Sequence, residues 1–323
     1  MQQERIIQIR PHDDSDSNVN KHTSKGIPMQ FKPVEGLQYG SRDVAIHGGF
    51  FGGRKVFTIT STKGGIGKTT ISTNLAYLLS RMPGGPSVVI VDLMKSHGNV
   101  ATRLLVPSNI NVKSWEEHMK RDDALSNKVI LNSLVFRHPR TGLHIVPAVM
   151  PHEELTPELG EYVLRHLTQM FDYVVCDISS ASDKEIDQDL IKRVINMSNR
   201  TFAVIDYDNA TISDMQTRLT YWYKANVDID KISILANFEP SKNDGNSIGR
   251  ADMQSYFSGL DFAGALPEVC GIRAIQNKGK LVTEDPKHTL TQQMKTIFAK
   301  YEPTISSAAP KMSIFRKWLG GKA

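Results

Sequence analysis

The residues best suited to chemistry lie in one short segment, where two lysines enclose a run rich in glycine. Residues 63–70 read Lys-Gly-Gly-Ile-Gly-Lys-Thr-Thr. Glycines allow a loop to turn its backbone N–H groups toward an anion, and a helix that begins after such a loop directs its positive end at the same anion. A lysine placed like Lys68 contacts the outer phosphates of a nucleotide, and a hydroxyl placed like that of Thr69 binds Mg²⁺. We expect the nucleotide to contact Gly64, Gly65, Ile66, Gly67, Lys68, Thr69 and Thr70.

The elements around this segment are those that a phosphate-binding loop needs. Residues 55–61 are an apolar, β-branched run that predicts a buried strand ending at the loop. After the loop, apolar residues recur at helical spacing over 69–82, until the Pro-Gly-Gly-Pro run at 83–86. A glycine turn that only joins a strand to a helix is the simpler alternative. The order strand, glycine loop, lysine, threonine, helix disfavours it.

The rest of the chain alternates between short apolar runs and helical stretches. Further strands are predicted at 87–92, 143–147, 173–177, 201–206, 231–237 and 262–267. Helices are predicted near 155–169, 185–198, 209–225, 248–258, 270–279 and 288–301. Continuous apolar strands separated by helices are typical of an α/β fold with a mainly parallel sheet and helices on both faces.

The composition divides the chain into four parts. Residues 1–50 are polar and are expected to be a disordered or extended leader. Residues 51–301 contain the elements above and are predicted to form one α/β domain. Residues 302–310 are expected to be a linker, and residues 311–323 a basic amphipathic tail.

Cysteine, histidine and hydropathy patterns disfavour several classes of protein. The two cysteines, Cys176 and Cys270, are far apart in the sequence, which predicts a reduced cytoplasmic protein without a disulfide framework. The ten histidines form no HxH or HExxH pattern, so we expect no metal site built from them. No apolar run approaches the ~20 residues that a membrane-spanning helix needs.

The positive charge of the chain is concentrated near its C-terminus. The formal net charge is +5, and residues 311–323 contribute +4 of it, which leaves +1 for residues 1–310. A protein that binds DNA over a broad face is usually more basic than this. We therefore do not expect specific binding of nucleic acid.

The glycine loop departs from the ordinary phosphate-binding pattern in a way that indicates a family. It lacks the usual glycine at Thr62 and carries Lys63 instead. In this it resembles KGGxGK[ST], the deviant Walker A motif of the MinD/ParA family of SIMIBI P-loop NTPases, and the resemblance covers residues 54–301. In that family the extra lysine reaches across a dimer interface to the nucleotide of the partner subunit. The resemblance implies that Lys63 couples ATP binding to homodimer formation.

Later segments resemble the same family in the same order. Residues 171–177, FDYVVCD, resemble the Walker B strand, which implies that Asp177 helps to hold Mg²⁺ together with Thr69 and Asp92. The residues that the resemblance assigns to the reaction are Lys63, Lys68 and Asp92.

Two further segments resemble the family's adenine-binding elements. Residues 231–238, KISILANF, resemble the strand whose asparagine, here Asn237, reads the adenine edge. The segment that begins Gly-Ala-Leu-Pro-Glu resembles the one after the last core strand, where Pro267 and Glu268 would lie beside the adenine. The resemblance thus implies ATP and Mg²⁺ as cofactors.

Within the family, the segment after the second strand is most similar to the TadZ/CpaE branch, which positions Tad (Flp) pilus machinery. Residues 91–105 read VDLMKSHGNVATRLL, with one more residue before Gly98 than the DxDPQGN pattern of ParA proteins. The implied function is an ATP-dependent dimerisation switch that positions a pilus or secretion apparatus. The alternatives are a ParA-like partition ATPase that binds DNA non-specifically, and a metabolic P-loop enzyme related to the nitrogenase iron protein. The low cysteine content disfavours the latter.

The same segment also predicts a weakened ATPase. The family carries D-x-D here, and its second aspartate helps to position the attacking water, whereas this chain reads Asp92-Leu93-Met94. A thioether is a weak acceptor that carries no charge. We expect ATP hydrolysis to be slow or lost unless a partner supplies the missing group. The alternative is that Asp92 itself positions the water.

The C-terminal tail has the pattern of a helix that binds a surface. Over residues 311–320, an apolar helical face is bordered by basic residues, as in helices that lie at anionic membrane surfaces and as in the tail of MinD. The residues on this face are Ile314, Phe315, Trp318 and Leu319. Docking on the protein's own core or on a partner is the alternative. We expect a cytoplasmic protein that sits peripherally on the inner membrane or at a cell pole.

Overall fold

The strands form one sheet with the phosphate-loop strand near its centre. The structure, a computed structural model, describes residues 54–94, 98–121, 125–178, 185–240 and 248–309. Its strands are β1 (Lys55–Ser61), β2 (Val88–Leu93), β3 (Phe136–Arg137), β4 (His144–Val146), β5 (Tyr173–Ile178), β6 (Arg200–Ile205), β7 (Ile232–Glu239) and β8 (Asp261–Pro267). Their order is β3-β4-β2-β5-β1-β6-β7-β8, and all neighbours are parallel except β3 and β4.

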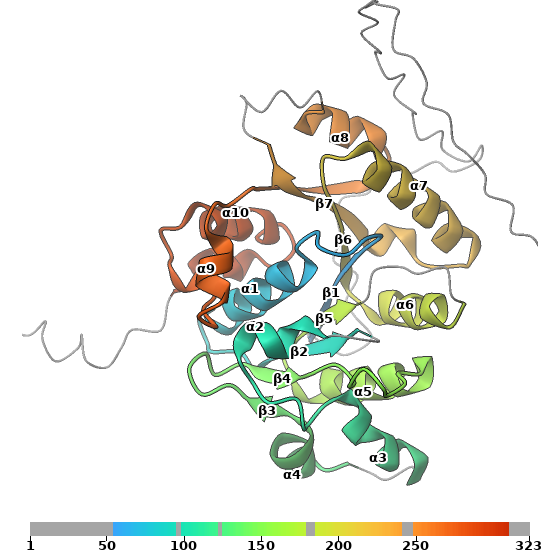
Figure 1. Ribbon diagram of the computed structural model, residues 1–323, viewed down its shortest axis with the longest axis vertical. Coiled ribbons are helices and arrows are strands. Elements are labelled where there is room, and N and C mark those ends of the chain that lie inside the picture. Colours follow the sequence, from blue (N-terminus) through green and yellow to red (C-terminus); the bar gives the residue numbers. More distant parts are fainter. Residues whose placement is uncertain (1–53, 95–97, 122–124, 179–184, 241–247, 310–323) are drawn as a thin grey trace, which may run out of the picture.

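Helices cover both faces of this sheet. They are α1 (Lys68–Ser80), α2 (Asn99–Leu104), α3 (Glu116–Arg121), α4 (Asn127–Val129), α5 (Pro157–Met170), α6 (Glu185–Met197), α7 (Asn209–Lys224), α8 (Arg250–Tyr256), α9 (Ile272–Gln276) and α10 (Thr289–Phe298). Figure 1 shows α1, α9 and α10 on one side of the sheet and α5, α6 and α7 on the other.

Each sheet face buries its own apolar cluster. In β1, Val56 packs in the cluster under α5 and α6, whereas Phe57 and Ile59 pack in the cluster under α1 and α10. β1 is buried on both faces, and Thr58 and Thr60, which alternate with Phe57 and Ile59, are buried as fully as their apolar neighbours. The predicted fold class, a mainly parallel sheet with helices on both faces, is confirmed.

The sequence patterns did not predict the short elements between β2 and β4. β3 is two residues long and antiparallel. α3 and α4 belong to a region of short turns with local caps, in which the side chain of Asn111 accepts a hydrogen bond from the Lys113 amide and that of Ser126 from the Val129 amide. Helices of one or two turns display no repeated apolar face, so periodicity cannot reveal them.

The segment after α10 differs from the predicted linker. Residues Pro303–Ser307 form a 3₁₀ helix, and Ile305 and Ala308 are buried in the cluster under α1 and α10. The carboxylate of Glu302 accepts hydrogen bonds from Lys55 Nζ at 2.6 Å and from the Tyr173 hydroxyl at 2.9 Å. Residues 302–310 were predicted to be a linker, but Ile305 and Ala308 anchor this segment to the domain.

The leader at 1–50 and the tail at 311–323 lie outside the described residues. Among the helices that the structure describes, none is both long enough and apolar enough to cross a bilayer.

Candidate nucleotide-binding site

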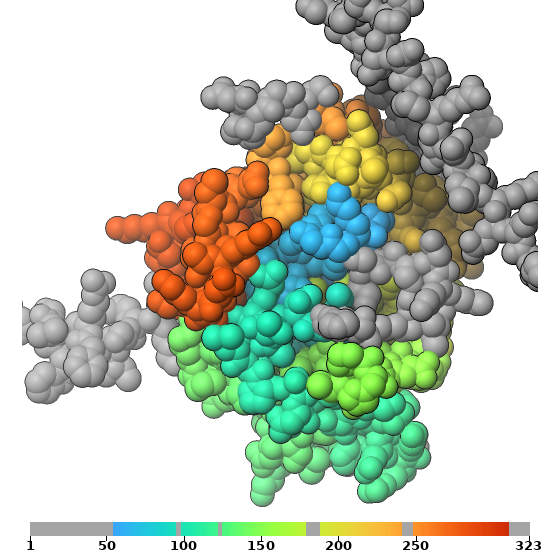
Figure 2. All heavy atoms as spheres, in the orientation of Figure 1, coloured from blue at the N-terminus to red at the C-terminus, as the bar shows by residue number. Residues whose placement is uncertain are grey.

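The glycine loop lies between the end of β1 and the start of α1, at the edge of the sheet where the parallel strands end. Gly65 and Gly67 have φ angles of 77° and 95°, a region that favours glycine. A Cβ on Gly67 would lie 2.3 Å from Asn237 Nδ2, so a side chain there would also clash. Figure 2 shows the loop, in blue, at the surface between α2 in teal, α7 in yellow and the orange segment that contains α9.

Lys68 is buried inside this loop. Its ammonium group donates to Ser61 Oγ at 3.0 Å and to the Lys63 carbonyl at 3.2 Å. Burial lowers the pKa of Lys68, whereas the charges of Asp177 and Asp92 raise it. The loop therefore holds a cation at its centre, close to two carboxylates.

Those carboxylates come from the ends of two adjacent strands. Asp92 of β2 and Asp177 of β5 are register partners, and both are fully buried. Burial raises the pKa of each carboxyl, and the charge of Asp177 raises that of Asp92 further. Asp92 accepts hydrogen bonds from the amides of Met94, at 3.2 Å, and Val100, at 3.1 Å.

Asp177 has the properties of a metal ligand. Among the described residues, neither of its oxygens accepts a hydrogen bond of normal geometry, although the Thr69 hydroxyl lies near enough to lower its pKa. Carboxylate and hydroxyl oxygens are the donors that Mg²⁺ prefers, and an ion would compensate the buried charge. Thr69, Asp92 and Asp177 thus fit Mg²⁺, which would neutralise phosphate charge between them.

Lys63 is directed away from this centre. Its ammonium group forms ion pairs with Asp206, at 2.9 Å, and with Asp208, at 3.2 Å, and 38% of its side chain is exposed. Partial burial lowers the pKa of Lys63, but hydrogen bonds to the two aspartates raise it above the usual value. Asp206 follows β6 and Asp208 caps α7. The two lysines of the loop therefore have different environments: Lys68 is buried near two carboxylates, and Lys63 is partly exposed and paired with two others.

A cleft of about 880 Å³ opens beside the loop. This volume is within the range of ~300–1,000 Å³ that is usual for small-molecule sites. The cleft is lined by Gly65, Gly67, Thr70, Ile71, Arg103, Asn237, Phe238, Leu266, Pro267, Glu268, Val269, Cys270, Gly271, Ile272, Arg273, Ala274, Gln276, Leu290 and Met294. The structure thus brings the predicted adenine-side residues to the same cleft as the phosphate loop.

The three predicted adenine-side residues differ in position. Asn237 is buried, and its Nδ2 donates to the Ile66 carbonyl at 2.8 Å, so its amide group supports the loop. Pro267 is half-buried, and Glu268 is exposed at the rim. Each lines the cleft, and their contacts with adenine remain a prediction.

The structure adds cleft residues that the sequence patterns did not indicate. Phe238 follows Asn237 with a φ of 57° and is 37% exposed. Gln276 of α9 donates from Nε2 to the Thr70 hydroxyl at 2.9 Å, and Arg103 of α2 donates to Gln276 Oε1. Arg103 and Gln276 come from helices of one to two turns, and Phe238 lies where the register of β7 is irregular, so hydrophobic periodicity does not mark them as cleft residues.

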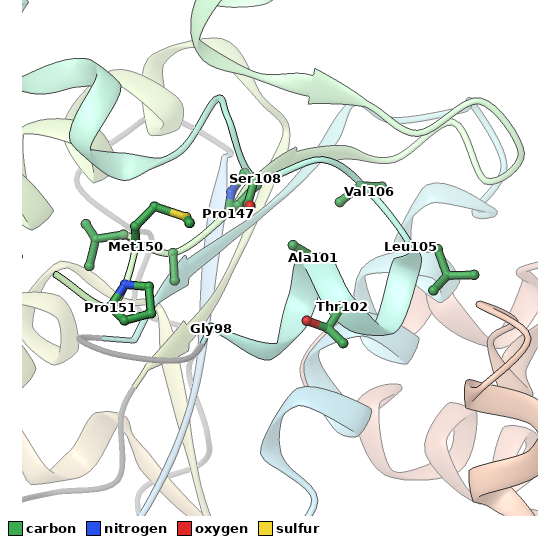
Figure 3. A pocket seen from close by; sticks show the side chains of 11 residues that line it. Gly98, Ala101, Thr102, Leu105, Val106, Ser108, Pro147, Met150 and Pro151 are labelled. Atoms are coloured by element: carbon green, nitrogen blue, oxygen red, sulfur yellow. The ribbon is translucent and has the colours of Figure 1, made fainter. Parts of the chain in front are cut away.

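A second hollow of about 400 Å³ lies beside α2 (Figure 3). Ala101 and Thr102 of α2 line one side, and Met150 and Pro151, which follow β4, line another. None of its lining residues carries an ionisable side chain. This hollow therefore differs from the first cleft, which Arg103, Glu268 and Arg273 line.

Comparison with known proteins agrees with this geometry. Residues 57–282 match the family described as the CobQ/CobB/MinD/ParA nucleotide binding domain. An uncharacterized ATP-binding protein of Methanocaldococcus jannaschii is 27% identical over 161 residues, which cover 47% of this chain and 56% of that protein. The match thus spans little more than half the length of that relative.

Solved structures show the same fold at low identity. A ParA family ATPase from Chlorobium tepidum has a TM-score of 0.64 and 18% identity, over 77% of this chain and 98% of that one. The septum site-determining protein MinD of Pyrococcus horikoshii, complexed with Mg-ADP, has a TM-score of 0.61 and 19% identity, over 79% of this chain and 99% of that one. Since the family match covers well over half of the sequence, the chain belongs to the CobQ/CobB/MinD/ParA nucleotide-binding domain family.

Proposed function

We propose that this chain is an ATP-operated dimerisation switch that positions a pilus or secretion apparatus, as TadZ/CpaE proteins do, at the inner membrane or a cell pole. The proposal depends most on one observation, the place of Lys63. Its side chain leaves the phosphate loop and pairs with Asp206 and Asp208 on the surface of the same chain.

The centre of the loop already has its own cation. Lys68 is buried, and the charges of Asp92 and Asp177 favour its ammonium form. A second ammonium group near the surface adds nothing to this centre, but it can reach a phosphate held by a second copy. ATP binding would then favour the dimer, because each site is completed only by its partner.

The position of Ala309, the last described residue before the tail, agrees with a tail that acts away from the nucleotide. The amide of Ala309 donates to the Arg81 carbonyl at 3.2 Å, just beyond the end of α1. α1 begins at the loop and has 13 residues, so its far end lies about 20 Å away at 1.5 Å per residue. We propose that the predicted helix over 311–320 attaches the dimer to anionic lipid without covering the loop.

Light scattering tests the switch. Wild-type protein is expected to be monomeric with ADP and dimeric with Mg-ATP. Lys63→Ala is expected to bind ATP, as measured by calorimetry, but to stay monomeric. The control Lys224→Ala, which removes a lysine from the exposed end of α7, is expected to dimerise like wild type. A Lys63→Ala protein that dimerises like wild type would refute the role of Lys63. Retention of DNA of unrelated sequences by the ATP-bound protein would favour partition instead.

A further inference from the structure

Arg103 has an unusual position for an arginine. It lies in the last turn of α2 and lines the nucleotide cleft together with Gly67 and Thr70 of the phosphate loop. α2 is tied to the metal-side carboxylates, because the Val100 amide donates to Asp92. Arg103 thus lines the cleft from α2, whereas Asn237 lines it from β7.

The guanidinium group is incompletely satisfied. One of its terminal nitrogens donates to Gln276 Oε1, but Nε is buried and donates to no described group. Among the described residues no carboxylate forms an ion pair with Arg103. Burial lowers the pKa of Arg103, and the charge of Asp177 raises it, so the cation lies within electrostatic reach of the metal side.

A cation that is partly buried in a cleft without a counter-ion is unfavourable, and an anion that entered the cleft would relieve this cost. Guanidinium groups match phosphate oxygens with two parallel hydrogen bonds. The group that Arg103 already contacts, Gln276, binds the Thr70 hydroxyl at 2.9 Å. Arg103 is therefore connected to the first turn of α1, one residue beyond Thr69.

We propose that Arg103 binds the diphosphate group of the nucleotide, at the end nearer to the nucleoside. Lys68 serves the outer phosphates and the loop amides cradle the inner ones. Arg103 lines the cleft together with Thr70, Pro267 and Gln276, and Gln276 joins it to Thr70 by hydrogen bonds. The inference rests on the proposed nucleotide site and adds a residue that contacts ATP and ADP alike.

Calorimetric titration of the full chain with Mg-ADP and Mg-ATP tests this. Arg103→Gln keeps a side chain able to hydrogen-bond to Gln276. This variant is expected to bind ADP and ATP more weakly than wild type by the same factor, about ten- to hundredfold, which is the effect of losing a charged hydrogen bond. Arg103→Lys is expected to recover only part of the loss. Arg165→Ala, which removes an arginine from the exposed face of α5, is expected to bind like wild type.

Four results would overturn the inference. Wild-type affinity of Arg103→Gln for ADP would show that the guanidinium group does not contact the diphosphate. Weaker binding of ATP alone would place the guanidinium group at the outer phosphate. A lower melting temperature of the nucleotide-free Arg103→Gln protein with unchanged affinity would assign Arg103 to folding. Lys68→Ala is expected to bind neither nucleotide. If wild type also bound neither, the proposed nucleotide site and this inference would fail together.

Discussion

The ammonium group of Lys63 lies 2.9 Å from Oδ2 of Asp206 in its own chain. A lysine that is proposed to complete the site of a second copy is therefore held by its own chain in the monomer. It must exchange two aspartates for a phosphate when the dimer forms. The position of Lys63 in the monomer and its proposed position in the dimer thus compete.

Weakening this hold is expected to favour the dimer. Asp206→Asn removes a charge from a partly exposed ion pair, and such pairs contribute about 0–1 kcal/mol. The dissociation constant of the Mg-ATP dimer should fall about two- to fivefold in sedimentation equilibrium. Asp214→Asn, on the exposed face of α7, is the control. A weaker dimer in Asp206→Asn would mean that Asp206 itself contacts the partner.

Binding of Mg-ATP is expected to release protons at neutral pH. The pKa values of Asp92 and Asp177 are raised by burial, so in the free protein these carboxyls hold protons above the usual range. A metal ion needs them ionised and displaces those protons. Calorimetry in buffers of different ionisation enthalpy should give proton release that is larger at pH 6.5 than at pH 8.5. Titration with ATP in the presence of EDTA should release fewer protons than titration with Mg-ATP. Equal proton release in the two titrations would contradict a metal site at Asp92 and Asp177.

The same pair determines one component of the stability of the free protein. A carboxyl whose pKa is raised on folding favours the folded state below that pKa and loses this contribution as the pH rises through it. The melting temperature without nucleotide is therefore expected to fall as the pH rises from 5 to 8 more in wild type than in Asp92→Asn. An equal fall in both proteins would exclude this contribution from Asp92.

ATP turnover is expected to be slow because of Met94. The amide of Met94 donates to Asp92, but its thioether is a poor acceptor for water. In single-turnover measurements, Met94→Asp should hydrolyse ATP faster than wild type, by up to about 10²-fold for a restored water-positioning group. Met94→Asn, a polar side chain without charge, is the matched control. Rapid hydrolysis by wild type would show that Asp92 is sufficient.

The tail is expected to attach the protein to anionic vesicles. Trp318→Glu places a charge on the predicted apolar face, whereas Ser313→Glu places the same charge on the opposite face of the predicted helix. Only Trp318→Glu should abolish sedimentation with vesicles rich in phosphatidylglycerol. Equal sedimentation of both variants would favour attachment through another surface.

The main elements and the centre of the site could be predicted because strong local patterns mark them. The strand before Lys68 and the apolar run before Asp177 define the ends of β1 and β5, and parallel strands bring such ends to one edge. Arg103 and Gln276 could not be predicted, because their contact joins two short helices far apart in the sequence. The packing of Ile305 likewise depends on tertiary contacts that composition does not reveal.

Mixing two inactive variants tests the central claim most directly. Lys63→Ala is expected to bind ATP but to lack the reaching lysine, and Lys68→Ala is expected to retain that lysine but to bind no ATP. If Lys63 acts on the partner's nucleotide, the two proteins mixed with Mg-ATP should form a heterodimer with one complete site. Sedimentation velocity with a fluorophore on the Lys68→Ala protein should then show a labelled dimer that neither variant forms alone. A mixture that stays monomeric while wild type dimerises would contradict the claim that Lys63 completes the site of a second copy.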